Sequence, residues 1–199
     1  MARPAQPIPD HRQRRLLSVA AKEFDKGYAE ASLNKILKEA GFSKSSFYHY
    51  YSNKEELFDM VAAVAVTNVM STIPLPQPEQ LDASTYADQI ARTIHQLSEA
   101  IYPGSAAHWL STVVLLNGEG MRGTVAQATE LIRAWLRQMC QRAIDLELIE
   151  NPLSIDLMSS YAETLIHTTI SWVIDNPDQA ADAWATIERI VRKQLTSGQ

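Results

Sequence analysis

The sequence predicts an all-α protein of about nine helices, and three observations support this class. Apolar residues recur at the 3.6-residue period of an amphipathic helix in one segment after another along the 199 residues. Prolines, glycines and Asn-Pro pairs fall between these segments, where helices end. One apolar run, 109–116, stays ambiguous, because its length suits a buried strand as well as a helix.

Composition limits the class of protein further. The apolar fraction of 46% is ordinary for a globular chain, and no run of about 18 apolar residues is present that would span a membrane. A single cysteine, Cys140, excludes an internal disulfide and fits a reducing cytosol. We therefore expect a cytoplasmic protein with no membrane segment.

Charge is distributed unevenly. The chain carries a net charge of −5, yet residues 1–54 hold 10 basic and 5 acidic side chains, whereas the remainder holds 8 basic and 18 acidic ones. A basic amino-terminal quarter on an acidic body is the distribution that a localised DNA-binding module needs. The overall negative charge argues against indiscriminate binding to nucleic acid.

The amino-terminal segments read as an arm followed by short helices. Residues 1–9 hold three prolines and predict a flexible arm. A first helix begins at Asp10, and a second is capped by Ser32 and ends at Gly41. The second helix and the short helix that follows it are joined by a tight turn that contains glycine, and two such helices form a helix-turn-helix.

The third predicted helix, from Lys44 to Tyr50, has two chemically different sides. Ser43 is a suitable N-cap, because its hydroxyl accepts a bond from an orphan amide. Phe47 and Tyr51 share a side and are expected to be buried. The opposite side holds groups that bond phosphates and base edges: Lys44, Ser45, Ser46, Tyr48 and His49.

A fourth predicted helix starts near Asn53 and runs to about Ile73, where prolines break it. Lys54 lies at its first turn, so the ammonium and the nearby free amides could hold a phosphate. Ser32 could add a phosphate contact, although its role as an N-cap explains it equally well.

Five further helices are predicted in the acidic body, over 86–101, 106–116, 125–144, 155–174 and 180–195. The last two carry apolar residues on more than one face, which requires a second packing partner. They either lie at the centre of the chain's own bundle or form an interface with a second copy.

Chemistry in the body is sparse. Aromatic and methionine side chains with a few polar groups line many apolar ligand pockets, and four are our candidates here: Trp109, Trp135, Met139 and His167. The alternative is that they are ordinary core residues and a hydrogen-bonded histidine. No pair of histidines has metal-ligand spacing and no catalytic motif is found, so we expect no enzyme activity, no metal and no cofactor.

The segment 16–57 resembles the tetracycline-repressor (TetR) family. The positions that carry the resemblance are Ala20-Ala21, Phe24, Gly27-Tyr28, Ser32, Ile36, Ala40-Gly41, Ser43-Lys44, Tyr48-His49-Tyr50, Asn53-Lys54 and Leu57. The chain departs from the family's common residues at Leu37, Phe42, Ser45 and Tyr51. Ser45 lies on the exposed side, where a change can alter base preference.

This resemblance implies a domain division and a function. The division is an arm over 1–9, a helix-turn-helix DNA-binding domain over 10–53, and a ligand-binding and dimerisation domain over 54–199. The implied function is a transcriptional repressor, a homodimer through its last two helices, which a small and largely apolar ligand releases from a palindromic operator. An activator or corepressor-dependent regulator remains an alternative, as does a helical small-molecule-binding protein or enzyme with no DNA role.

Overall fold

The computed structural model describes residues 8–102, 105–117, 123–150 and 152–196, and within these ranges it contains nine α-helices and no strand. Three short helices form the amino-terminal unit: α1 (Asp10–Phe24), α2 (Leu33–Ala40) and α3 (Lys44–Tyr50). The predicted all-α class and the predicted starts of these helices are confirmed.

The longer helices form the remainder of an elongated molecule. They are α4 (Lys54–Thr72), α5 (Tyr86–Ala100), α6 (Ala106–Asn117), α7 (Gly123–Asp145), α8 (Ile155–Asp175) and α9 (Ala180–Thr196). Two 3₁₀ turns, η1 (Pro78–Gln80) and η3 (Pro177–Gln179), each begin with a proline, and Pro177 follows two residues after the end of α8. The ambiguous run 109–116 is helical and lies in α6.

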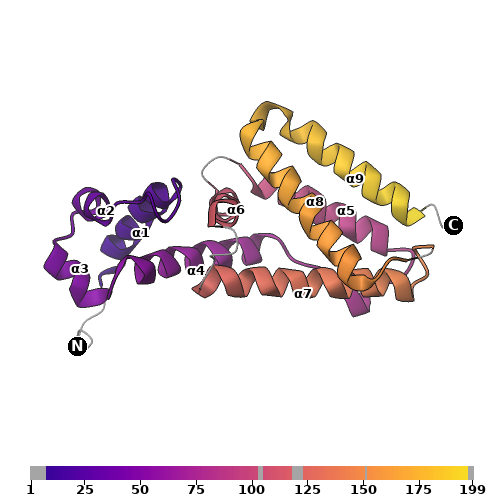
Figure 1. The fold of residues 1–199 in the computed structure, drawn as a ribbon, viewed down its shortest axis with the longest axis horizontal. Helices are drawn as coiled ribbons and strands as arrows, with labels where there is room; N and C mark the ends of the chain where they lie inside the picture. The colour runs from indigo at the N-terminus through magenta and orange to yellow at the C-terminus, as the bar shows by residue number, and fades with distance from the viewer. Residues whose placement is uncertain (1–7, 103–104, 118–122, 151, 197–199) are drawn as a thin grey trace.

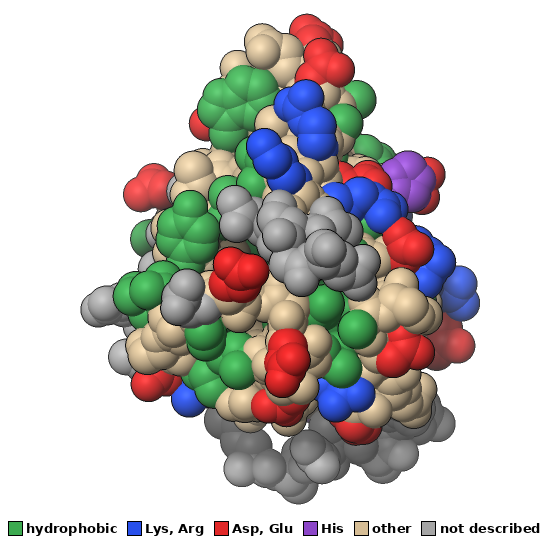
Figure 2. Space-filling view, turned by 90° about the vertical axis from the view of Figure 1, so that its right-hand side faces the viewer, with side chains coloured by type: hydrophobic (Ala, Val, Ile, Leu, Met, Phe, Trp, Pro, Cys, Tyr) green, Lys and Arg blue, Asp and Glu red, His purple; other side chains and the backbone are tan. Residues whose placement is uncertain are grey.

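Figure 1 shows α1, α2 and α3 at one end and α5, α8 and α9 packed together at the other, with α4 running from the first group along the body. In the part of the chain that the structure covers, no helix is long and apolar enough to cross a membrane. The opposite end of the molecule from α3 carries mixed charges, with apolar side chains along one side (Figure 2).

Three apolar clusters hold the fold together. The first, which we call the reading-head core, joins α1–α4 and also includes Trp109 of α6 and Val125 of α7. It therefore continues past the predicted boundary at residue 54. Ile8, predicted in the arm, is also buried in this core.

The other two clusters lie in the body. The second, the α5–α7 cluster, is built on Tyr86, Met139 and Leu148. The third, the α5–α9 cluster, surrounds Val173 and Trp184 and draws apolar side chains from α4, α5, α6, α8 and α9.

Candidate nucleic-acid interface and ligand-binding body

The turn between α2 and α3 is set by local chemistry. Gly41 ends α2 in the left-handed region at φ 73°, and its amide donates to the carbonyls of Leu37 and Lys38. Ser43 then caps α3, because its Oγ accepts from the Ser46 amide at 3.0 Å. The predicted helix-turn-helix is thus present, with three residues between its two helices.

One side of α3 is fixed by aromatic packing. Phe47 has no exposed surface and Tyr51 is 4% exposed. Their rings stack with centroids 5.3 Å apart, as their shared side predicts. Arg12 of α1 lies over the buried Phe42 ring, 4.6 Å from its centroid, so α1 also contacts the turn between α2 and α3. This packing leaves α3 little freedom to rotate.

The other side of α3 faces solvent. Lys44, Ser45 and His49 are exposed, and Tyr48 is 50% exposed, with its ring edge-on to Phe47 at 5.2 Å. Ser46 is half-buried and so reaches less far into solvent than its neighbours. The surface therefore presents a cation, hydroxyls, an imidazole and a phenol together on one short helix, held from behind by a rigid core.

Lys54 and Ser32 have structural partners. The Lys54 ammonium donates to the carbonyls of Tyr28 at 2.7 Å and Ala31 at 3.0 Å, and lies 4.3 Å from the centroid of the Tyr28 ring. Lysine has three donors, so one remains. Ser32 caps α2 by accepting from the Lys35 amide at 3.4 Å. Both residues thus secure the segment between α1 and α2, a task that the sequence alone did not assign to Lys54.

A buried carboxylate closes the same segment. Glu23 of α1 is 6% exposed and pairs through one oxygen with Lys35 at 2.8 Å and Lys26 at 3.0 Å. Its second oxygen accepts from the Ser32 amide at 3.4 Å. The hydrogen bond from Lys35, then that from Lys26, lowers the pKa of Glu23 to about 2 against the opposing effect of burial. We call these interactions of Glu23 the Glu23 clasp. It could not be predicted from the sequence, because Lys35 and Ser32 lie beyond the turn that follows α1.

Trp109, a candidate ligand residue, instead joins α6 to α1 and α4. Its indole Nε1–H donates to the Ala21 carbonyl of α1 at 2.9 Å. Its ring lies 5.9 Å from that of Phe58 in α4, and Phe58 in turn packs edge-on against Phe24 at 5.0 Å. The indole therefore contributes to the packing and hydrogen bonding that hold α6 against α1.

The remaining ligand candidates lie elsewhere. Trp135 and Met139 belong to the α5–α7 cluster, where the Trp135 indole donates to the Pro76 carbonyl at 2.9 Å. The Tyr86 hydroxyl donates to the Met139 carbonyl at 2.7 Å, and burial raises the pKa of this phenol. His167 is half-buried on α8. The structure does not bring the four candidates into one pocket.

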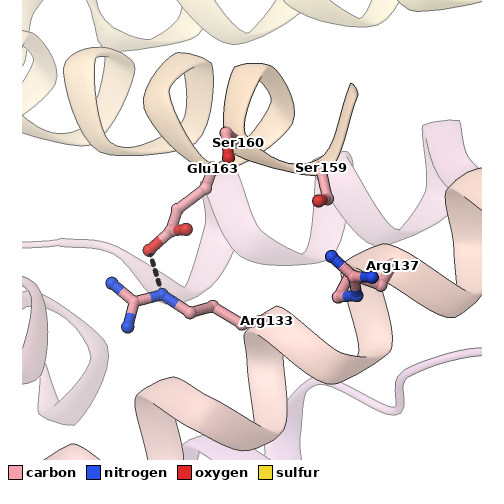
Figure 3. Close-up of a pocket in the computed structure, with 5 residues that line it drawn as sticks. All are labelled: Arg133, Arg137, Ser159, Ser160 and Glu163. Carbon is pink, nitrogen blue, oxygen red and sulfur yellow. Dashed lines mark hydrogen bonds and ion pairs between the residues drawn. The ribbon is translucent and has the colours of Figure 1, made fainter. Parts of the chain in front are cut away.

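A polar groove of about 320 Å³ lies between α7 and α8 and is lined by Arg133, Arg137, Ser159, Ser160 and Glu163. Figure 3 shows the Arg133 guanidinium bonded to Glu163 across the groove, with Arg137 at its other end. Arg133 also pairs with Glu130, and Arg137 pairs with Asp156. Since each cation already has a carboxylate partner, the groove is best described as an ion-pair seam that joins the two helices.

Asp59 of α4 forms a contact with the start of α7. The Asp59 carboxylate accepts from the Thr124 amide at 3.1 Å and so caps the start of α7. Gly123 is required beside it, because a Cβ at this position would lie 2.1 Å from the Asp59 oxygen. In the described residues, no cluster of three or more His, Cys, Asp or Glu side chains is arranged to hold a metal ion.

A helix-turn-helix with one exposed polar face is the arrangement of a class of DNA-binding proteins. Residues 16–61 match the family described as "Bacterial regulatory proteins, tetR family". This amino-terminal segment therefore matches the TetR family, as the resemblance predicts.

Comparison with individual proteins adds detail. The chain is 45% identical over 47 residues to the uncharacterized HTH-type transcriptional regulator YdgC of Bacillus subtilis (strain 168), a match that covers 23% of this chain and 24% of that relative. The match is thus confined to about a quarter of either protein.

Solved structures resemble the whole chain in fold. AibR in complex with isovaleryl coenzyme A and operator DNA has a TM-score of 0.71 at 15% identity, covering 90% of this chain and 97% of AibR. FadR from Bacillus subtilis in complex with stearoyl-CoA has a TM-score of 0.65 at 20% identity, covering 94% and 98%. At these identities the likeness concerns the fold.

Proposed function

We propose that the protein is a sequence-specific DNA-binding transcriptional regulator that places α3 in a major groove. The observation that carries this proposal is the exposed polar side of α3, held in one orientation by the burial of Phe47 and Tyr51 in the reading-head core. A rigid helix with donors and acceptors on its outer side can hydrogen-bond base edges, which a mobile one does only at an entropic cost.

Each predicted contact has a chemical role in this proposal. Ser45, Ser46 and His49 read base edges, and Tyr48 contacts a phosphate or a thymine methyl. Lys44 serves either a base or a phosphate. Ser32 and the remaining donor of Lys54 contact phosphate beside it, which positions the module without reading sequence.

We propose that two copies associate through α8 and α9. Large apolar side chains on these helices are exposed in the single chain: Leu157 at 54%, Tyr161 at 71%, Trp172 at 41% and Ile190 at 48%. Exposed apolar surface of this kind marks an interaction site, and a second copy with a two-fold axis is the commonest partner. The two-fold axis then requires a palindromic operator.

We further propose that the regulator is a cytoplasmic repressor without enzyme activity, released by a small-molecule effector. The division into a DNA-binding domain over 10–53 and a sensing domain over 54–199 goes with this proposal. Support comes from the complexes of AibR with isovaleryl coenzyme A and of FadR with stearoyl-CoA, two proteins of this fold that bind a small molecule. A ligand that prefers a conformation with mis-spaced reading helices would weaken operator binding, and operator would weaken ligand binding equally.

Three connections are available to carry such a change. The first is the covalent one, α4, which begins at Lys54 directly after the reading head. The others are non-covalent: the Trp109 indole on the Ala21 carbonyl, and the Asp59 cap on α7. A displacement of α6 or α7 can therefore move the amino-terminal helices through these two non-covalent contacts, in addition to the covalent link.

The test is selection of bound DNA from a random pool, followed by binding measurements on the recovered site. Tyr48→Ala should weaken binding at least tenfold with the slope of the salt dependence nearly unchanged, because a neutral phenol releases no counterion from a phosphate. Tyr102→Ala is the matched control, because this tyrosine is 60% exposed and follows α5, a helix at the opposite end of the molecule from α3 (Figure 1). Lys54→Ala is unsuitable, since it also removes two bonds that position α4.

Recovery of no common DNA sequence would reject the proposal and favour a helical ligand-binding protein. If a sequence is recovered, the sign of a reporter's response to the protein separates repression from activation.

A further inference from the structure

One buried tryptophan differs from the others in its hydrogen bonding. Trp184 of α9 is 5% exposed, and its indole Nε1 has no hydrogen-bond partner among the described residues. The indoles of Trp109 and Trp135 both donate to backbone carbonyls at 2.9 Å. Buried donors in native proteins are almost always paired, so an orphan N–H points to a partner that binds there.

The described side chains around Trp184 are apolar. In the α5–α9 cluster, buried Ile101, Ala107 and Val173 are joined by partly buried apolar side chains. The side chains around the indole come from the end of α4 and from α5, α6, α8 and α9, including Leu97, Ala107 and Ile170. Such a lining suits a ligand that is largely apolar.

The charge of the ligand follows from the buried groups. An indole N–H donates and cannot accept, so its partner is an acceptor atom. The one charged side chain that is buried in the described residues is Glu23, which lies in α1 and is already paired. A carboxylate placed beside Trp184 would therefore have no buried counter-ion, which strongly disfavours it.

We propose that Trp184 Nε1–H is the polar anchor of an effector site in the α5–α9 cluster, and that this site takes a small, uncharged, largely apolar molecule with a carbonyl-type oxygen. The proposal rests on the proposed function for the meaning of "effector", and it names a residue and a ligand class for that site. Ala107, in the same cluster, is two residues from Trp109 in α6, so an occupant of the site contacts the helix that bonds to α1.

The test uses the full-length protein with 15N-labelled tryptophan, whose four indole signals are recorded by NMR. Trp184→Phe assigns its signal by deletion and keeps an aromatic ring in place. Acetophenone is compared with ethylbenzene, which has nearly the same shape and no acceptor, and 2-heptanone is compared with charged heptanoate. The ketones and heptanoate are added up to about 10 mM, well above the Kd of ~1 mM at which a fragment-sized ligand is detected. Ethylbenzene is added up to its solubility limit in water and compared with acetophenone at the same concentration.

We expect a saturable shift of the Trp184 indole signal with either ketone, and a smaller or no shift with ethylbenzene and heptanoate. Trp184→Phe should weaken ketone binding about five- to tenfold, the usual effect of one lost hydrogen bond. Leu131→Ala is the control, because this side chain is 71% exposed on α7 and lies outside both the α5–α9 cluster and the proposed dimer surface, and it should leave ketone affinity unchanged. Failure of both ketones to shift the signal, equal shifts from ethylbenzene, or unchanged affinity in Trp184→Phe would each overturn the proposal.

Operator binding is measured separately on the same samples. Sequence-specific DNA binding combined with an unresponsive Trp184 signal rejects this site while the proposed function stands. A responsive signal in a protein that recovers no operator supports the site and rejects its assignment to DNA regulation.

Discussion

The Glu23 clasp makes a quantitative prediction about the reading head. Glu23→Gln keeps the shape of the side chain and removes its charge, so the interactions with Lys26 and Lys35 are lost together. The pKa of Glu23 falls from its ordinary 4.5 to about 2 in the folded protein. A difference of this size corresponds to about 3 kcal/mol before screening, at about 1.4 kcal/mol for each tenfold change in acid strength.

Screening by water lowers the expected effect. The side chains of Lys26 and Lys35 are 52% and 48% exposed, so their attraction to the carboxylate is partly screened. We therefore expect Glu23→Gln to lower the free energy of unfolding at pH 7 by about 1 to 2 kcal/mol. Glu39→Gln is the matched control, because this carboxylate is 53% exposed and lies 3.9 Å from Lys35, and it should cost less than about 0.5 kcal/mol.

The pH dependence gives a second, independent readout. Because the folded-state pKa is depressed, the contribution is complete above the unfolded-state value of 4.5 and disappears as pH falls from there towards about 2. Urea unfolding of the wild type and Glu23→Gln, followed by circular dichroism, should thus give a constant gap from pH 7 to about pH 5 and a closing gap below. A gap that is absent at pH 7, or that persists unchanged at about pH 3, would refute the assignment of this stability to the buried ion pairs.

Three further substitutions test other parts of the structure. Phe47→Ala empties the centre of the stack behind α3 and should cost about 3 to 5 kcal/mol in urea unfolding; a cost below about 1 kcal/mol would mean that the side chain is not buried. Tyr86→Phe removes the donor to the Met139 carbonyl and should cost about 1 kcal/mol. Because burial raises the pKa of Tyr86, the wild type should also lose stability as pH rises past about 10, whereas Tyr86→Phe should lose less. Gly123→Ala forces Asp59 away from the α7 amide and adds a side chain at φ 60°, so it should destabilise the protein more than Asp59→Ala does, as thermal unfolding would reveal.

Local features of the fold could be predicted because their causes are local. The caps at Ser32 and Ser43 and the left-handed Gly41 depend on residues within one turn, and each was evident in the sequence. The 3.6-residue period in the same way determined that Phe47 and Tyr51 would be buried together. The residues exposed on α3 follow from that burial, so the candidate DNA surface could be named in advance.

Partners far apart in the chain were decided by the tertiary structure. Trp109 appeared as a pocket candidate, yet its indole bonds to a carbonyl 88 residues away in α1. Lys54 appeared as a phosphate contact, and two of its donors serve the segment before α2. Periodicity states which side of a helix is apolar, and it carries no information on which distant carbonyl or ring lies opposite.

By itself, the sequence determined the all-α class, the helix-turn-helix and the chemistry of its exposed side, since these depend on spacing and capping within a few residues. The tertiary structure alone decided which buried indoles have a hydrogen-bond partner in the described part of the chain. Trp184 was one position in an apolar stripe, and the lack of a partner for its N–H among those residues became visible when five helices closed around it. A hydrogen bond requires two groups to meet in space, so its absence at a buried donor can be recognised when the neighbours are in place.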